Sequence, residues 1–319
     1  MAALLLAIGS AEAQQPSKIP RIGYVSGTGS ATDQGPYVDA LRRGLRDLGY
    51  VEGRTFVIEY RGGEGKPNRY AALVNELVQL KVDVLVVPTL PAVLAAKKAT
   101  QTIPIVMVAN RDPVANGIVD SLARPGGNIT GIATLSQDLG GKRLEMLTVT
   151  VPRLKRIGIL GGPRGVSTVI SFKEYELAAR ALKLEFQAIE VESANLDLPG
   201  AFQSAVKGGV SAIVTITTSL LFPRQNQIAE LTIKNRLPSL FEGSTWVDSG
   251  GLMSYSTDDV AVYRRASTYV DKILKGAKPA DLPIEQPTKF ELVINLKAAK
   301  QTGVAIPASM LARADGVIK

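Results

Sequence analysis

The side chains in this chain that could do chemistry are small polar groups in loops that follow strand-like segments. Most carry a hydroxyl or an amide, one is a carboxylate and one is the only tryptophan. The candidate ligand-binding residues are Ser26, Thr28, Thr89, Asn110, Asp112, Thr218, Ser219, Ser244 and Trp246. Hydroxyls and backbone N–H groups near a helix N-terminus can hold a carboxylate without a buried counter-charge. The pattern therefore predicts non-covalent binding of a small molecule.

Several carboxylates and the tryptophan have more than one interpretation. Trp246 follows a short polar segment and could stack on an aromatic ligand, or could pack as a buried or partly exposed indole. Asp112 precedes a proline, so its carboxylate could bind a cation or cap a turn or helix. Asp258 and Asp259 could form a catalytic pair, but their place at a predicted helix start favours capping and compensation of the helix dipole.

Two glycine-rich segments resemble phosphate-binding loops only in part. Gly27-Thr28-Gly29 lies between a predicted strand and a predicted helix, but Thr32 stands where the third glycine of a dinucleotide fingerprint would be. The segment 124–128, Arg-Pro-Gly-Gly-Asn, is better explained as a tight turn whose glycines adopt positive φ before a core strand. Neither segment therefore predicts a nucleotide cofactor.

The missing residue types disfavour enzymatic and metal chemistry. The chain contains no histidine and no cysteine. The commonest general base, the commonest metal ligand and disulfide formation are therefore all removed. No Ser-x-x-Lys, paired-carboxylate or metal-ligand pattern falls in a plausible loop. We expect no enzyme activity, no cofactor and no metal. An exported sugar or ester hydrolase is the enzyme alternative, and the absence of histidine argues against it.

The charge of the chain is positive but dispersed. The formal net charge is +8, and 45% of the 319 residues are hydrophobic. Such a composition is typical of a folded globular protein, and the length suffices for two domains of ordinary size. The lysines and arginines form no block and have no interleaved aromatics. They therefore indicate a solvated surface, with weak steering of an anionic ligand, and no nucleic-acid partner.

The first 13 residues form an uncharged apolar run that closes on Ala11-Glu12-Ala13, a small-x-small triplet that signal peptidase accepts. A basic leading region is missing, so the start codon could be placed too late, or the run could be a frayed terminus. The run is shorter than the ~20 residues that a bilayer crossing needs. Residues 1–13 are therefore interpreted as a signal peptide remnant. Without cysteine there is no lipid anchor, so we expect a soluble periplasmic protein.

β-branched runs alternate with helical patterns from Arg21 almost to the end of the chain, which predicts parallel sheets covered by helices. The predicted strands span 21–25, 56–60, 84–87, 105–108, 129–132, 156–160, 185–189, 212–217, 238–241 and 290–295. Among the helices, Asp33 or Thr32 caps the first, Asn68 caps the second and Pro91 opens the third. Later helices span 171–182, 198–207, 223–234 and 258–274, and a last one ends at Gly303. The fold class is α/β, with two doubly wound lobes and a ligand cleft where the carboxyl ends of their sheets face each other.

Longer motifs in the chain resemble the ABC-transporter substrate-binding proteins of the tryptophan/tyrosine-binding type. These motifs are Gly49-Tyr50-Val51-Glu52-Gly53, Ile103-Pro104-Ile105-Val106, Asp112-Pro113-Val114, the run from Ser121 to Gly131, Gly141-Lys142-Arg143-Leu144-Glu145, the run from Gly250 to Tyr255 and the run from Pro287 to Asn295. The resemblance covers nearly the whole mature chain. It implies a type I periplasmic-binding-protein fold with three crossovers between lobes, near 134–139, 254–257 and 279–287. The first lobe would then contain 17–134 and 255–280, and the second lobe 135–254 and 281–319.

The family's ligands are commonly aromatic amino acids or related small acids. Thr89 matches the family's threonine after the third strand, and Asp112 matches its Asp-Pro turn. Where tryptophan-binding members have an Asp-Asn pair, this chain has Thr218-Ser219, so the carboxylate that would pair with an α-ammonium group is lost. The resemblance and this departure together favour a small anionic acid, aromatic or amino-acid-like.

The expected function is that of a monomeric periplasmic solute-binding protein, which hands its ligand to an ABC transporter permease in the inner membrane. Binding energy would shift a hinge equilibrium and would drive no chemistry. The alternative is a bilobed ligand-sensing module of a signalling or regulatory system. A transcriptional regulator of this design would need a DNA-binding helix pair ahead of Arg21.

Overall fold

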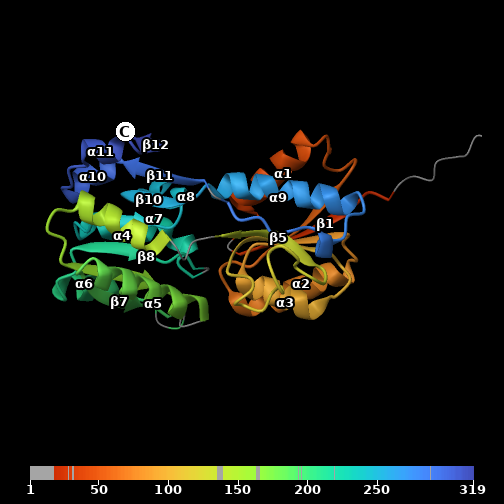
Figure 1. Ribbon diagram of the computed structural model, residues 1–319, viewed down its shortest axis with the longest axis horizontal. Helices are drawn as coiled ribbons and strands as arrows, with labels where there is room; N and C mark the ends of the chain where they lie inside the picture. Colours follow the sequence, from red (N-terminus) through yellow and green to blue (C-terminus); the bar gives the residue numbers. More distant parts are fainter. Residues whose placement is uncertain are drawn as a thin grey trace, which may run out of the picture.

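Two β-sheets, each covered by helices on both faces, form two lobes that lie side by side (Figure 1). The computed structural model describes residues 18–27, 29–30, 32–134, 139–162, 166–192, 194, 196–218, 220–287 and 289–319. The predicted signal peptide remnant and two candidate ligand residues, Thr28 and Ser219, lie outside these residues.

The first sheet has the strand order β2-β1-β3-β4-β5, with every neighbouring pair parallel. Its strands are β1 (Arg21–Ser26), β2 (Val57–Gly62), β3 (Val84–Val87), β4 (Ile105–Arg111) and β5 (Ile129–Thr134). The helical elements of this lobe are α1 (Gly35–Asp47), η1 (Pro67–Arg69), α2 (Tyr70–Gln79), α3 (Leu90–Ala99), α9 (Asp259–Leu274) and η3 (Pro279–Asp281).

The second sheet has the order β12-β11-β10-β9-β8-β6-β7, in which only the pairing of β10 with β11 is antiparallel. Its strands are β6 (Arg156–Gly161), β7 (Glu185–Glu190), β8 (Ala212–Thr215), β9 (Ser239–Phe241), β10 (Met253–Thr257), β11 (Phe290–Asn295) and β12 (Gly316–Ile318). The helical elements of this lobe are α4 (Leu139–Thr150), α5 (Val166–Ala181), α6 (Leu198–Lys207), η2 (Phe222–Arg224), α7 (Gln225–Lys234), α8 (Ser244–Asp248), α10 (Leu296–Thr302) and α11 (Ala308–Leu311).

Each sheet separates two hydrophobic cores, because successive side chains of a strand point to opposite faces. In β1, Ile22 and Tyr24 pack with α1 and α9, whereas Val25 packs on the other face with α2 and α3. All four residues of β3 are buried, as expected for a central strand of a parallel sheet. The sheets are thus the rigid bodies that position the loops at their carboxyl ends.

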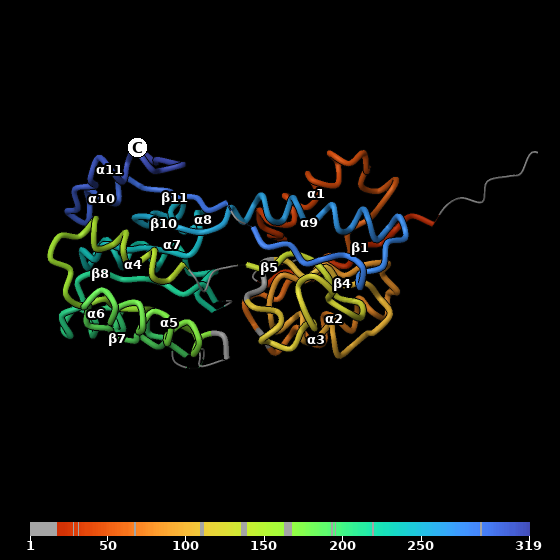
Figure 2. The backbone as a smooth tube through the Cα atoms, viewed as in Figure 1, coloured from red at the N-terminus to blue at the C-terminus, as the bar shows by residue number. Residues whose placement is uncertain are grey.

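Helix α9 follows the second lobe's strand β10 in the chain but packs on α1 of the first lobe. The two helices approach most closely at Gly44, where an added Cβ would lie 2.5 Å from the carbonyl oxygen of Arg264 and 2.5 Å from Ser267 Oγ. Figure 2 shows the chain leaving β10 for α9 and then returning to β11. Helix α9, within the range 255–280 that was expected in the first lobe, is part of that lobe's core.

Hydrogen bonds place the crossovers a few residues away from the boundaries expected from sequence. β10 pairs with β9 and β11 up to Thr257, so residues 255–257 belong to the second sheet. On the return, Ile284 N donates to the carbonyl of Leu122 (2.8 Å), and Ala133 N donates to the carbonyl of Glu285 (2.9 Å). Residues 281–285 therefore lie along the first lobe, because their backbone extends the pairing of β5.

The predicted strands match strands of the structure, and the predictions 84–87 and 290–295 match to the residue. The helix α6 also matches its prediction, and the expected left-handed stop is present at Gly303 (φ 76°). The α-helices and β-strands that were not predicted are α4, α8, β10, α11 and β12. The 124–128 segment is confirmed as a turn, because Gly126 and Gly127 have φ of 71° and 60°.

Two predicted helix caps are wrong. The second helix begins at Tyr70, and its cap residue is Arg69 with no side-chain bond, because a 3₁₀ turn that contains Asn68 precedes it. The first helix begins after Gln34, so neither Thr32 nor Asp33 caps it.

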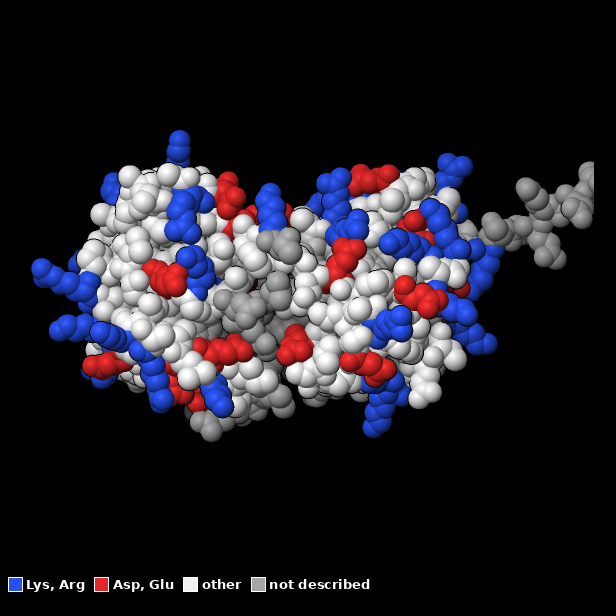
Figure 3. All heavy atoms as spheres, viewed as in Figure 1, with Lys and Arg blue, Asp and Glu red and all other residues white. Residues whose placement is uncertain are grey.

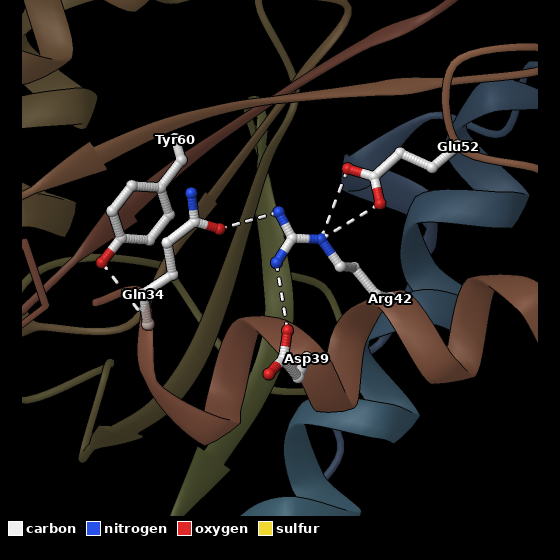
Figure 4. A network of polar contacts seen from close by, with 5 residues as sticks. All are labelled: Gln34, Asp39, Arg42, Glu52 and Tyr60. Carbon is white, nitrogen blue, oxygen red and sulfur yellow. Dashed lines mark hydrogen bonds and ion pairs between the residues drawn. The ribbon is translucent and has the colours of Figure 1, made fainter. Parts of the chain in front are cut away.

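Instead, the side chain of Arg42, within α1, bonds residues at the beginning of the helix (Figure 4). Its guanidinium donates to Gln34 Oε1 (2.8 Å), Asp39 Oδ1 (3.1 Å) and Glu52 Oε2 (3.1 Å). The Tyr60 hydroxyl donates to the carbonyl of Gln34 (3.4 Å). The start of α1 is therefore fixed by Arg42, from within the helix, and by Tyr60 of β2, and not by a side-chain cap.

Candidate functional site

In the first lobe, the loops after β1 and β3 lie against each other. Ser26 ends β1, and its Oγ accepts a hydrogen bond from Gly29 N (2.9 Å). Thr89 follows β3, and its Oγ1 accepts from Ala92 N (3.4 Å) as the cap of α3. A Cβ at Gly27 would lie only 2.6 Å from Thr89 Cγ2. Two of the predicted ligand residues, Ser26 and Thr89, are therefore brought together at one edge of the sheet.

In the second lobe, the loop after β8 lies against the end of β6. Thr218 Oγ1 accepts from Leu221 N (3.2 Å), and a Cβ at Gly162 would lie 2.8 Å from that same oxygen. The carbonyl of Thr218 accepts from Phe222 N (2.9 Å), so Thr218 and Phe222 belong to one tight loop. We refer to the described residues 216–218 and 220–222 as the β8 loop.

The two lobes meet where these loops end. Tyr37, in the first turn of α1, has its ring centroid 5.9 Å from that of Phe222 in the β8 loop. The other face of Tyr37 stacks on Tyr263 of α9 with a centroid distance of 4.5 Å. Figure 3 shows lysines and arginines spread over both lobes. The segments that follow β1 and β8 therefore meet across the junction of the lobes.

The Asp112 side chain stabilises the turn in which it lies. It has a φ of +34°, its Oδ1 accepts from Ala115 N (2.9 Å), and its carbonyl accepts from Asn116 N (3.1 Å). The turn interpretation is confirmed and accounts for the carboxylate without a cation. Asn110 lies in β4, where it pairs with Ala133 of β5; the position of its side chain is outside what the structure describes.

Trp246 lies in the core of the second lobe and not on an open wall. Its side chain is 1% exposed, its ring stacks on Phe241 at 5.1 Å, and its edge meets Phe222 at 6.3 Å. The packed-indole interpretation is therefore supported, and the interpretation as an exposed ligand wall is corrected, because Phe241 covers one face of the ring and almost none of the side chain is exposed. Ser244, at the start of α8, is half-buried and hydrogen-bonds the carboxylate of Glu291.

A half-buried carboxyl at the junction of the lobes has contacts that the sequence did not indicate. Asp258 caps α9 by accepting from Ala261 N (2.9 Å), which confirms the capping interpretation. Asp259, in contrast, is half-buried: Tyr37 donates to its Oδ2 (3.4 Å), and Thr257 donates to its Oδ1 (3.4 Å). Burial is the main cause that raises the pKa of Asp259 to about 7, and Asp258 and Glu291 add to the rise.

A buried ion pair in the second lobe was also missed. Arg143 of α4 lies 3.2 Å from Glu242, which follows β9, with side-chain exposures of 1% and 3%. No sequence pattern within one element could indicate it, because the partners are 99 residues apart.

The described residues contain no group of three or more acidic or other metal-ligating side chains that could hold a metal ion. None of the helices in the described part of the chain is long and apolar enough to cross a bilayer. What the site does offer is hydroxyls and backbone amides at the carboxyl ends of strands from two lobes, which suits binding of a polar or anionic small molecule.

Two α/β lobes with parallel sheets and several crossovers define the class of type I periplasmic-binding-protein-like structures, as expected. The chain belongs to the ABC transporter substrate binding protein family, whose model matches residues 30–318. It is 26% identical, over 265 residues, to a tyrosine-binding protein of Clostridioides difficile (strain R20291); the match covers 82% of this chain and 75% of that protein.

Two solved structures have the same architecture over almost the whole chain. A conserved domain protein from Vibrio cholerae O1 biovar eltor superposes with a TM-score of 0.85 at 27% identity, covering 94% of this chain and 100% of that one. An ABC domain from Streptococcus pneumoniae in complex with L-Trp superposes with a TM-score of 0.84 at 25% identity, covering 94% and 99%. The chain is therefore a substrate-binding protein by family and by fold.

Proposed function

We propose that this protein captures a small organic acid, aromatic or amino-acid-like, between its lobes and delivers it to an ABC permease in the inner membrane. The observation that carries the proposal is the meeting of the two lobes at Tyr37 and Phe222. Thr218 lies in the same loop as Phe222, and Ser26 ends the strand that precedes α1, the helix of Tyr37. Thr89 lies against Gly27, the residue after Ser26. A ligand held by both sets of loops would stabilise the closed arrangement, which a permease can recognise.

The chemistry of the loops supports an acid as the ligand. Thr89 and Thr218 each begin a helical turn, where free backbone N–H groups and hydroxyls favour negative charge. Two relatives are named for aromatic amino acids, tyrosine and L-Trp. Because Thr218 and Ser219 replace the Asp-Asn pair of tryptophan-binding members, we propose that the carboxylate of the ligand is essential and its amine is not.

We further propose that the protein is exported, remains unanchored in the periplasm and acts without catalysis. The apolar run 1–13 and the absence of cysteine support export without a lipid anchor. The absence of histidine supports binding without turnover. Detection of the mature chain, starting near Gln14, in a periplasmic extract would test the location directly.

A thermal-shift screen with three matched compounds tests the ligand class. L-tryptophan carries both charged groups, indole-3-acetate only the carboxylate and tryptamine only the amine. The protein should first be unfolded and refolded to remove any bound ligand. At a concentration of 100 times its Kd, a ligand selective for the folded state adds about 2.7 kcal/mol to the free energy of unfolding.

Stabilisation by indole-3-acetate and L-tryptophan, but not by tryptamine, is the expected result. Stabilisation by tryptamine would contradict an essential carboxylate. If neither these compounds nor L-tyrosine and benzoate shift the transition, the aromatic-acid proposal fails. Recovery of each compound unchanged after incubation separates a binding protein from an enzyme.

A further inference from the structure

The strongest unexplained feature is the buried ion pair between Arg143 and Glu242. The Arg143 guanidinium donates through Nη1 to Glu242 Oε1 (3.2 Å) and to the Tyr175 hydroxyl (3.1 Å). Tyr175 in turn donates to Glu242 Oε1 (3.0 Å). All three side chains are buried. Removing two charges from water is costly, so such a pair is weak evidence for a purely stabilising role.

The second oxygen of Glu242 connects this cluster to the β8 loop. Glu242 Oε2 accepts a hydrogen bond from Thr217 N (2.9 Å). Thr217 directly precedes Thr218, whose carbonyl accepts from Phe222 N. A bond to an ionised acceptor is stronger than a neutral one, so Glu242 fixes the backbone at the beginning of the loop.

Arg143 connects the same cluster to two crossovers. It lies in α4, the first element described after the crossover that follows β5. Its Nε donates to the carbonyl of Tyr255 (2.8 Å) in β10, the strand that leads into the second crossover. The Arg143–Glu242 ion pair is therefore bonded to β10, which leads into a crossover between the lobes. It is also bonded to the β8 loop, which contacts the first lobe through Phe222.

We propose that Glu242, held by Arg143, is a positioning residue that fixes the β8 loop in the orientation needed to close on the ligand. The expected effect on ligand binding rests on the proposed function. The structural consequence, a fixed Thr217 amide, can be measured without any ligand.

Two double variants separate positioning from stability. Arg143→Met/Glu242→Gln and Arg143→Met/Glu242→Met both remove the two buried charges and keep similar volumes. Only glutamine retains an oxygen that can accept from Thr217 N. Both variants contain Arg143→Met and therefore both lose the hydrogen bond from Arg143 to the Tyr255 carbonyl. The effect of that loss cancels when the two variants are compared.

Amide hydrogen exchange at Thr217, measured without ligand, is the primary measurement. We expect exchange within a few-fold of wild type in the glutamine variant and at least about tenfold faster exchange in the methionine variant. Affinity for the compounds used as probes, L-tryptophan and indole-3-acetate, should fall by about tenfold or more only in the methionine variant. The methionine variant should also melt at a lower temperature, because the Thr217 amide and the Tyr175 hydroxyl lose their acceptor.

Equal Thr217 exchange and equal affinity in the two variants would overturn the inference. If the wild type binds neither probe, the proposed ligand class fails, while the exchange comparison still decides the positioning role. Should a double variant not fold, Glu242→Asp replaces it. That variant keeps the negative charge, but its side chain is one methylene too short to reach both Arg143 and Thr217 N. Exchange at Thr217 should therefore be faster than in the wild type. Unchanged exchange in Glu242→Asp would also count against the inference.

Discussion

Tyr37 of the first lobe and Phe222 of the second lobe form an aromatic contact across the junction, with ring centroids 5.9 Å apart and planes tilted by 38°. Tyr37 is itself supported by the stacked ring of Tyr263, and Phe222 by the edge of Trp246. The contact thus links the aromatic cores of both lobes. Any change in the angle between the lobes must alter it.

Phe222→Ala should shift the lobes toward a more open arrangement. An aromatic pair contributes about 0.5–1.5 kcal/mol beyond its buried area, so affinity for a ligand bound between the lobes should fall by roughly 2- to 10-fold. Small-angle scattering should show a larger radius of gyration without ligand. The fluorescence of Trp246, the only tryptophan, should change as well.

Phe186→Ala is the matched control for this prediction. Phe186 is also half-buried and makes an aromatic contact, an edge-on pair with Phe172 at 6.5 Å, but both rings belong to the second lobe. It should lower stability without changing the radius of gyration. Equal scattering profiles for wild type and Phe222→Ala would show that the contact does not hold the lobes.

Asp259 should make the stability of the protein depend on pH between about 4 and 7. Its pKa is raised to about 7 in the folded protein, from an ordinary value of 3.8. In that window the folded state binds the proton and the unfolded state releases it, so stability is full below the window and is lost as pH rises through it. The slope from this group approaches roughly 1.4 kcal/mol per pH unit and vanishes above pH 7.

Asp259→Asn should remove this slope and be more stable than wild type above pH 7, as measured by denaturant unfolding at a series of pH values. Tyr37→Phe provides the comparison: the Tyr37 hydrogen bond lowers the pKa of Asp259, so its loss should extend the slope to higher pH. A constant difference between wild type and Asp259→Asn from pH 4 to 8 would contradict the assignment.

Thr89→Ala should affect both binding and folding. Loss of a ligand contact would weaken binding by about 1–3 kcal/mol, because a buried partner is left unpaired. Loss of the α3 cap should cost a further ~1 kcal/mol of unfolding free energy. Thr89→Ser keeps the hydroxyl oxygen and should retain most of the ligand affinity and most of the unfolding free energy. Calorimetric titration that gives unchanged affinity for Thr89→Ala would remove Thr89 from the ligand site.

Gly44→Ala should destabilise the first lobe by about 1–3 kcal/mol, because the added Cβ forces α1 away from α9. The control is Gly141→Ala in α4, where nothing lies within 4 Å of an added Cβ. That change should stabilise by up to ~1 kcal/mol through helix propensity alone. Urea unfolding compares the two, and a stabilised Gly44→Ala would mean that the helices can separate without cost.

Much of the fold was accessible from sequence because its signals are local. The strands at Val84–Val87 and Phe290–Asn295 and the helix at Leu198–Lys207 each carry their own apolar pattern and stop signals, and their predicted limits agree with the structure. Short elements such as α8 and β12 contain too few residues for a hydrophobic periodicity to be recognised. β10 was taken for a connection because its pairing depends on β11, which lies more than 30 residues later.

The sequence by itself determined two α/β lobes, and it identified Ser26, Thr89 and Thr218 as candidates, since polar residues after parallel strands gather at one edge of a sheet. The tertiary structure alone decided that Trp246 is buried, that Tyr37 bonds Asp259 across 222 residues and that Arg143 meets Glu242 across 99. Local hydrophobic periodicity specifies which face of an element is buried. It does not specify which distant element covers that face, and burial and pKa depend on that packing.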